Sequence, residues 1–204
     1  GNVLKKTILV IDACVRREES RTKKLLEAAL DTVRKEHPDW NLEILNLMDL
    51  DLMYWKTETL KERDELLAKK EYDAPVFKYG NQFREADGVI VAAPFWDLSI
   101  PAVLKVYIEN ISAEGITFGC NESGLYGLCK AKWLLFLTTR GGIWADSDME
   151  QGSTYMEALC KFFGIDEYAC VYADGIDVQE LDGEEILREA IEETKGICTR
   201  LSCE

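Results

Sequence analysis

Residues 89–118 read VIVAAPFWDLSIPAVLKVYIENISAEGITF, and the organisation of the chain can be built outward from them. The opening residues are apolar and rich in β-branched side chains, which favours a short strand buried on both faces of a parallel sheet, although periodicity alone leaves a buried helix open. Pro94 ends the run because proline has no N–H to donate to a neighbouring strand. Phe95, Trp96 and Asp97 are therefore expected on a loop at the carboxyl end of this strand.

A helix is expected directly after this loop. Ser99 is a good N-cap, and Pro101 is tolerated in the first helical turn because the N–H that it lacks would be unpaired there. Leu104, Ile108 and Ile111 recur at helical spacing and would form the buried stripe. Two exposed aromatic residues are thus expected between the end of a buried strand and a helix, which is where open α/β sheets bind ligands.

A second strand–loop–helix unit begins the chain. Residues 7–11, TILVI, form another short apolar run, and a helix with one apolar stripe is expected from Ser20 to Glu36, with Ser20 as its N-cap. Arg16, Ser20 and Thr22 would surround the helix N-terminus, where unpaired N–H groups favour anions. Charged stretches of this kind are more often solvated loops, and the position after the first strand is what favours a site. The chain has no GxGxxG or Walker A sequence, which argues against a Rossmann or P-loop site.

The rest of the chain continues the alternation of strands and helices. Strands are expected at 41–47, 131–138 and 168–176, and helices at 149–163 and 181–201. Gly164 is expected to end the first of these two helices as a C-terminal glycine. Five strands alternating with helices indicate a parallel sheet with helices on both faces. We expect one domain over residues 1–204, in which 48–80, the least readable part, is a variable insertion with a charged helical segment.

The composition excludes several classes of protein. The chain has 204 residues, is 47% hydrophobic and carries a formal net charge of −14. This charge argues against a nucleic-acid or anionic-membrane partner, because either needs a basic surface. We expect no signal peptide and no transmembrane segment, since the apolar runs are too short for either.

Cysteine and histidine usage narrows the chemistry. The seven cysteines include no C-x-x-C pair, which favours free thiols in a reducing cytoplasm over disulfides, zinc or an iron–sulfur cluster. His37 is the only histidine, which removes Ser-His-Asp chemistry and most zinc sites. We expect His37 to be structural and no metal to be bound.

Several motifs of this chain resemble those of the FMN-dependent NADH-azoreductases, a family within the flavodoxin-like NAD(P)H–quinone oxidoreductases. Residues 94–98 (PFWDL) are similar to the family's Pro-aromatic-aromatic-Asn-hydrophobic loop, and 99–105 (SIPAVLK) and 115–118 (GITF) to the motifs that follow it. Residues 20–22 (SRT) match in type its Ser-x-Ser, and 139–142 (TRGG) its Ser-Arg-Gly-Gly. The resemblance runs from about residue 7 to residue 176.

The resemblance implies a fold and a cofactor site. The fold is a flavodoxin-like three-layer α/β/α sandwich whose five-stranded parallel sheet has the order 2-1-3-4-5. FMN would be bound through its phosphate by the loop after the first strand, and through its ring by the aromatic pair and by backbone amides. The cofactor-binding residues implied are Cys14, Arg16, Ser20, Arg21, Thr22, Pro94, Phe95, Trp96, Asp97, Leu98, Thr139, Arg140, Gly141 and Gly142.

The resemblance also implies an activity. FMN would pass electrons from NAD(P)H to a quinone, an azo compound or a similar small acceptor in two steps, so no catalytic acid or base is needed. A cytoplasmic homodimer with the flavin near its interface is implied as well. Tyr54, Trp55, Phe77 and Tyr79 could line the partner's pocket or could be core. Asp97 replaces the family's asparagine, and if its carboxylate faces the flavin, its charge should lower the flavin's reduction potential.

Three points stay open at this stage. An electron carrier of flavodoxin type or a flavin redox sensor would use the same site without steady-state turnover. The physiological acceptor is not set by any motif. Either Arg16 or Arg140 could bind the 2′-phosphate of NADPH, and nothing in the sequence selects NADPH over NADH.

Overall fold

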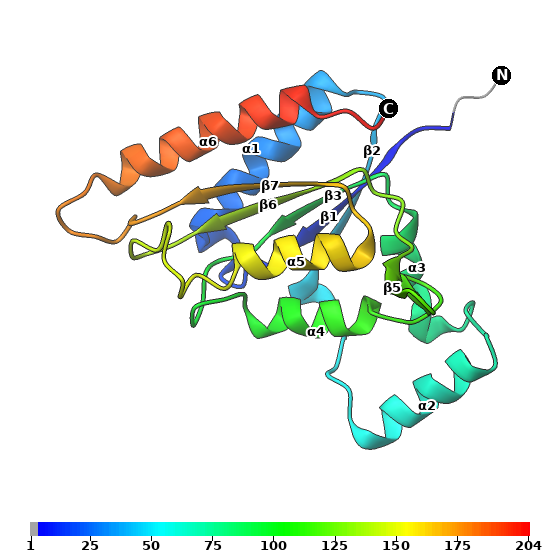
Figure 1. The fold of residues 1–204 in the computed structure, drawn as a ribbon. Coiled ribbons are helices and arrows are strands. Elements are labelled where there is room, and N and C mark those ends of the chain that lie inside the picture. Colours follow the sequence, from blue (N-terminus) through cyan, green and yellow to red (C-terminus); the bar gives the residue numbers. More distant parts are fainter. Residues whose placement is uncertain (1–3) are drawn as a thin grey trace.

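The computed structural model describes residues 4–204, which form a parallel sheet between two layers of helices (Figure 1). The five-stranded sheet has the order β2-β1-β3-β6-β7, and each neighbouring pair is parallel. The α/β/α architecture and the five-stranded parallel sheet predicted from the sequence are confirmed. The strands of the sheet are β1 (Thr7–Asp12), β2 (Asn41–Asn46), β3 (Gly88–Ala92), β6 (Trp133–Thr139) and β7 (Glu167–Ala173).

The predicted strand numbering, 2-1-3-4-5, is wrong because two short strands were not predicted. β4 (Phe118–Asn121) and β5 (Gly124–Gly127) form an antiparallel hairpin outside the main sheet. They lie in the chain between the third and fourth parallel strands, which makes the last two strands of the sheet β6 and β7. Their sequences, FGCN and GLYG, are short and rich in glycine, a residue depleted from strands, so no periodicity indicated them.

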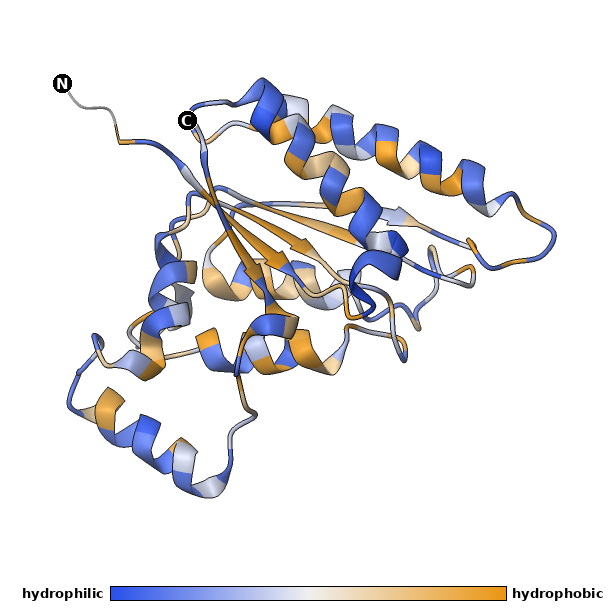
Figure 2. Cartoon of the chain, turned by 180° about the vertical axis from the view of Figure 1, so that it is seen from behind, coloured by the Kyte–Doolittle hydropathy of each residue, from blue (hydrophilic) through white to orange (hydrophobic). Residues whose placement is uncertain are grey.

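The central strands β1, β3 and β6 are almost completely buried. Alternate residues of each strand enter opposite cores, as for Val89 and Val91 on one face of the sheet and Ile90 and Ala92 on the other. Coverage of both faces explains the continuous apolar runs in the sequence. Figure 2 shows these hydrophobic strands between helices whose outer surfaces are hydrophilic.

The helices cover the two faces unequally. α1 (Arg21–Glu36) and α6 (Gly183–Arg200) pack on one face, and α4 (Ala102–Ile111), α5 (Ser153–Phe163) and α3 (Lys78–Glu85) cover the other. The predicted caps of two helices are confirmed: Ser20 Oγ accepts the N–H of Lys23 at the start of α1, and Gly164 ends α5 with φ of 81°. The predicted cap of α4 is wrong, because the helix is preceded by Pro101 rather than by Ser99.

The segment between β2 and β3 contains α2 (Thr57–Ala68), which extends away from the body of the molecule (Figure 1). α2 buries none of its own residues. Phe77, in contrast, is 1% exposed and packs with Ile116, so it belongs to the core. Tyr54 is 56% exposed. The segment therefore combines an anchored end with an exposed helix.

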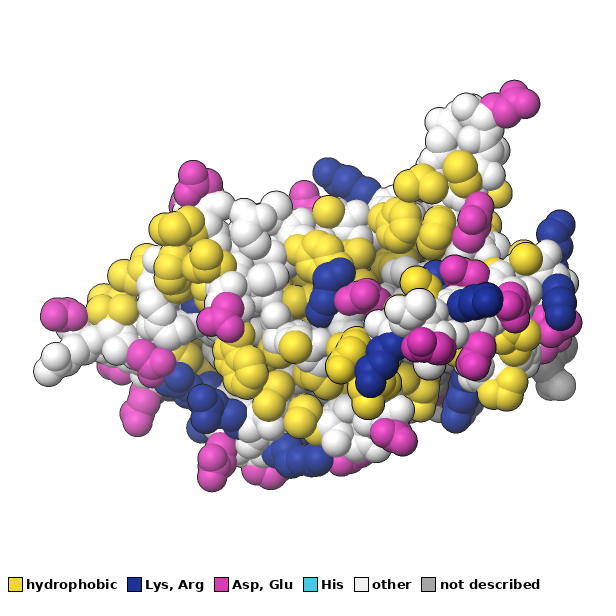
Figure 3. Space-filling view, turned by 90° about the horizontal axis from the view of Figure 1, so that it is seen from below, with side chains coloured by type: hydrophobic (Ala, Val, Ile, Leu, Met, Phe, Trp, Pro, Cys, Tyr) yellow, Lys and Arg dark blue, Asp and Glu magenta, His cyan; other side chains and the backbone are white. Residues whose placement is uncertain are grey.

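The face formed by α4 and α5 carries apolar side chains between its charged ones (Figure 3). The chain that leads into α2 lies along α4, since the Trp55 indole donates to the Glu109 carbonyl at 3.1 Å and Asn110 Nδ2 donates to the Met53 carbonyl at 3.3 Å. Met53 is 58% exposed on this face. Among residues 4–204, no helix combines the length and the apolar character needed to cross a bilayer.

Candidate functional site

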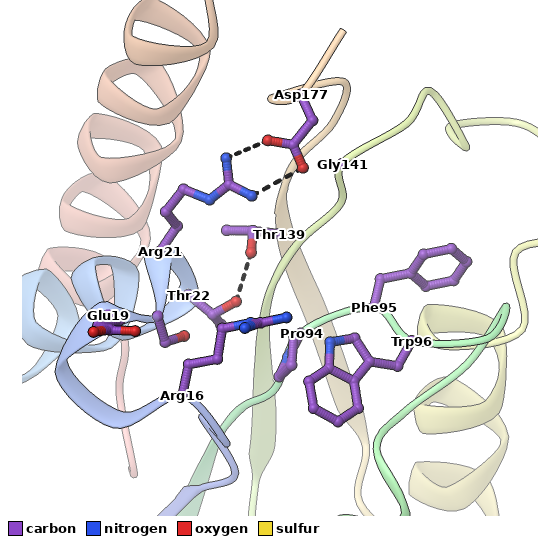
Figure 4. Close-up of a pocket in the computed structure, with 11 residues that line it drawn as sticks. Arg16, Glu19, Arg21, Thr22, Pro94, Phe95, Trp96, Thr139, Gly141 and Asp177 are labelled. Atoms are coloured by element: carbon purple, nitrogen blue, oxygen red, sulfur yellow. Dashed lines mark hydrogen bonds and ion pairs between the residues drawn. The ribbon is translucent and has the colours of Figure 1, made fainter.

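A cavity of about 180 Å³ lies at the carboxyl ends of β1, β3 and β6 (Figure 4). It is at the place where the strand order reverses between β1 and β3, the position at which open α/β sheets bind ligands. Four chain segments that are distant in sequence meet there. The lining residues are Arg16, Glu19, Ser20, Arg21, Thr22, Pro94, Phe95, Trp96, Thr139, Gly141 and Asp177.

One side of the cavity is the start of α1. The N–H groups of a first helical turn have no partner within the helix and carry partial positive charge, so this side favours an anion. Thr22 is fully buried, and its Oγ1 lies 2.6 Å from Thr139 Oγ1, which joins α1 to the end of β6. Within residues 4–204, Arg16 forms no ion pair, so its charge is available to a ligand.

An ion pair bridges the cavity between α1 and the loop after β7. The Arg21 guanidinium donates to both oxygens of Asp177, at 2.6 and 3.0 Å. These hydrogen bonds lower the pKa of the Asp177 carboxyl below its ordinary value of 3.8. A Cβ at Gly141 would lie 2.6 Å from Asp177 Oδ2, so a larger residue there would displace this carboxylate from its position beside Arg21.

The opposite side of the cavity is apolar. Phe95 and Trp96, expected to be exposed, are instead half-buried. The loop then reverses through a tight turn, in which the N–H groups of Trp96 and Ser99 donate to each other's carbonyls at 3.0 and 2.9 Å. Asp97 and Leu98 occupy the turn with φ of 50° and 70°, a two-residue conformation that suits asparagine and aspartate. Ser99 closes this turn, which is why it does not cap α4.

A buried ion pair lies beneath the loop after β1. Asp12 is 1% exposed, accepts the N–H of Cys14 at 2.9 Å and is paired with Lys23 of α1. The Cys14 side chain points into the core and does not line the cavity, and burial, followed by the charge of Asp12, raises the pKa of its thiol to about 12. Only the backbone of Cys14 is placed to contribute to a binding loop.

The side chain of Arg140 also lies outside the cavity. It is 2% exposed and forms ion pairs with Glu150 and Asp174 at 3.2 and 3.6 Å. A guanidinium buried among its own partners cannot bind the 2′-phosphate of a nucleotide, so that suggestion was wrong for Arg140. Arg16 remains the exposed candidate.

The structure thus brings nine of the fourteen predicted site residues to one cavity. The side chains of the other five do not line it: Cys14, Asp97, Leu98, Arg140 and Gly142. Sequence reasoning missed Glu19 and Asp177. Asp177 follows the last strand, and the rule that ligands bind at the carboxyl edge of the sheet could have indicated it. No grouping of three His, Cys, Asp or Glu side chains suited to a metal ion occurs in residues 4–204.

The fold defines a flavodoxin-like α/β protein, and its cavity has one side that favours an anion and an opposite side that is apolar. The sequence profile of the flavodoxin-like fold family matches residues 6–197. An FMN-dependent NADH:quinone oxidoreductase from Clostridium beijerinckii is 34% identical over 192 residues, which cover 92% of this chain and 96% of the relative. The chain therefore belongs to this flavodoxin-like family, together with the FMN-dependent NADH:quinone oxidoreductases.

Solved structures agree with this assignment. An azoreductase from Bacillus anthracis (strain Sterne) has a TM-score of 0.87 at 27% identity and covers 97% of this chain and 100% of its own. An FMN-dependent NADH-azoreductase from Bacillus anthracis (strain Ames Ancestor), solved in complex with FMN, has the same fold, with a TM-score of 0.84 at 24% identity over 97% of this chain and 99% of its own.

Proposed function

We propose that this protein is an FMN-dependent oxidoreductase that transfers electrons from NAD(P)H to a quinone, an azo compound or a similar small acceptor. The observation that carries the proposal is the cavity, whose helix N-terminus and apolar aromatic side face each other at the switch point of the sheet. Relatives that match nearly the whole chain are FMN-dependent NADH:quinone oxidoreductases.

The residues present fit FMN. Arg16, the Ser20 and Thr22 hydroxyls and the first N–H groups of α1 would hold the phosphate, because they combine positive charge with hydrogen-bond donors. Phe95 and Trp96 offer apolar ring faces, and Gly141 leaves its backbone open on the cavity side. When bound, FMN supplies the hydride and electron transfer itself, and the protein supplies binding, orientation and electrostatics.

The protein's own residues then have limited tasks. The Arg21–Asp177 bridge joins α1 to the loop after β7 and closes one side of the phosphate region. The half-buried aromatic pair keeps water from the ring region. The two acidic residues in the lining are Glu19 and Asp177, and Asp177 is engaged with Arg21, so we assign no catalytic acid or base to the site.

We also propose that the working form is a cytoplasmic homodimer. The cavity of about 180 Å³ is smaller than the roughly 300–1,000 Å³ of typical ligand sites, which supports a second copy as the remaining wall. Leu98, an exposed apolar residue on the loop that carries Phe95 and Trp96, supports an interface on this side. The segment 48–80 of one copy would then approach the site of the other.

The test is the visible spectrum of the purified protein with added FMN, before and after anaerobic NADH. A bound flavin that bleaches within the mixing time and recovers on addition of a quinone is the expected result. A bound flavin that NADH leaves oxidised would favour an electron carrier or a redox sensor, the alternative that the net charge of −14 supports. Failure to bind FMN would refute the proposal.

A further inference from the structure

The Arg140 side chain lies just behind the cavity. Arg140 directly follows β6, and its side chain and that of Thr139 point in opposite directions. Thr139 points toward α1, where it meets Thr22, whereas Arg140 points toward α5 and its N-terminal loop. Its guanidinium is therefore separated from the cavity by the β6 backbone and by Phe95.

Two carboxylates hold this guanidinium, and each also holds a loop. Glu150 pairs with Arg140 through Oε2, while its Oε1 accepts the N–H groups of Gly152 and Ser153 at 2.5 and 2.8 Å at the start of α5. Asp174 pairs with Arg140 at 3.6 Å and accepts the N–H groups of Trp144 and Ala145. The three charged residues thus connect the ends of β6 and β7 with the loop that leads into α5.

Aromatic rings flank the same guanidinium. Its central carbon lies 4.3 Å from the centre of the Tyr172 ring and 5.7 Å from that of the Phe95 ring, within the range of a cation–π interaction. The Phe95 ring in turn lies 5.6 Å from Trp144. Phe95 is part of the cavity wall, so Arg140 touches the cavity through Phe95 and through the backbone of the next residue, Gly141.

Stability alone gives a poor account of this arrangement. Buried ion clusters can often be replaced by apolar side chains with little loss of stability, because desolvation offsets the attraction between the charges. Here Arg140 is 2% exposed, and its Nε and Nη1 atoms have no hydrogen-bond partner within residues 4–204. Burial of a guanidinium with unpaired N–H groups costs stability, so its role is better explained by the neighbours whose position it fixes. One of them, Phe95, is part of the cavity wall.

We propose that Arg140 is a positioning residue for the ring of the flavin, acting through Phe95 and the Gly141–Gly142 backbone, with Glu150 and Asp174 as its supports. This inference rests on the proposed function, since it concerns the same cofactor. It assigns Arg140 to the ring end of the site and not to the phosphate end. The geometry suits arginine better than lysine, because a planar guanidinium can reach both carboxylates while its faces lie against the two rings.

The test compares Arg140→Lys and Glu150→Gln with a control, Glu85→Gln. Glu150→Gln keeps an oxygen for the N–H groups that start α5 and removes only the ion pair with Arg140. Glu85→Gln makes the same change of charge at an exposed ion pair with Lys130, before β3 and so at the amino end of the sheet. Each variant is titrated with FMN and with riboflavin, which lacks the phosphate, and the visible circular dichroism of bound FMN is recorded.

Both test variants are expected to weaken FMN and riboflavin binding by the same factor, about tenfold for a lost contribution of about 1.4 kcal/mol. Their flavin circular dichroism bands should shrink, and the control should match the wild type. Dissociation constants and spectra equal to those of the control would overturn the inference, as would a loss confined to FMN. Should Arg140→Lys fail to fold, Glu150→Gln decides. A wild-type protein that binds no FMN overturns the proposed function as well.

Discussion

Loss of the Lys23 ammonium should lower the free energy of unfolding, because the Asp12 carboxylate would remain buried without its partner. In Lys23→Met, the Asp12 carboxylate, 2% exposed, keeps only the N–H of Cys14 as a partner. Removal of one partner of a buried pair costs about 3–5 kcal/mol. Lys23 is 18% exposed and Asp12 retains one hydrogen bond, so we expect the lower end, about 3 kcal/mol.

Urea unfolding followed by circular dichroism measures this change. With an m-value of about 2–3 kcal/mol per molar urea, the midpoint should fall by about 1 M or more. The matched control is Lys195→Met, which breaks an exposed pair with Glu192 and should cost about 0.5 kcal/mol or less. The double variant Asp12→Asn/Lys23→Met leaves no buried charge and should recover much of the stability lost.

The stability that Lys23 contributes should also depend on pH, and it should decrease as the pH rises. Burial lowers the pKa of Lys23, but the hydrogen bond and charge of Asp12 outweigh it and raise that pKa above its ordinary value of 10.5. A raised lysine pKa contributes stability that is fully present below 10.5 and is lost as the pH rises through the folded-state value. A Lys23→Met variant as stable as the control at neutral pH, or a double variant that simply adds the two losses, would refute the reasoning.

Four further outcomes are expected. A Cβ at Gly127 would lie 2.0 Å from the carbonyl carbon of Phe163, so Gly127→Ala should cost about 1–3 kcal/mol in urea unfolding, and an unchanged midpoint would contradict the packing. Asp97→Asn keeps the turn and removes a negative charge from the loop that carries Phe95 and Trp96, so the FMN midpoint potential should rise; equal potentials would count against this. A thiol reagent should label Cys120 fast in the native protein, because Cys120 is exposed. Cys198 should react slowly, because it is buried and burial raises the pKa of its thiol to about 12. Simultaneous labelling of several cysteines, detected by mass spectrometry, would contradict this prediction. Asp177→Ala should speed FMN dissociation in stopped-flow experiments by the same factor at about pH 8 and about pH 5. The pKa of the Asp177 carboxyl is lowered, so its ion pair with Arg21 persists until the pH falls through that lowered pKa. A factor that vanishes by about pH 5 would contradict the assignment.

The sequence was informative where one local rule decided the structure. The runs around Val89 and Thr7 are continuous because both faces of the sheet are covered, so their strands could be predicted. Ser20 and Gly164 act through their own backbone neighbourhood and were placed correctly as caps. The prediction for Ser99 was wrong because a serine at this position can either cap a helix or close a turn. Only the backbone hydrogen bonds between Ser99 and Trp96 decide between the two.

Features that depend on distant partners were not predictable. The hairpin β4–β5 packs its Gly127 against the end of α5, and nothing in its own short sequence indicates that contact. Arg140 was assigned to ligand binding because residues 139–142 resemble the Ser-Arg-Gly-Gly motif of the family. The burial of its side chain depends on Glu150 and Asp174, which lie in other segments of the chain and meet Arg140 only in the folded protein.

The outward helix α2 has a consequence for how such a protein can diversify. None of its residues is fully buried, but Leu66 and Leu67 near its end pack against the small buried cluster of Phe77, Ala113 and Ile116. The rest of the helix can therefore change in sequence while the sheet and its cofactor loops keep their geometry. For protein engineering, α2 is a segment into which a different helix can be grafted, provided that two apolar side chains still cover Phe77 and Ile116.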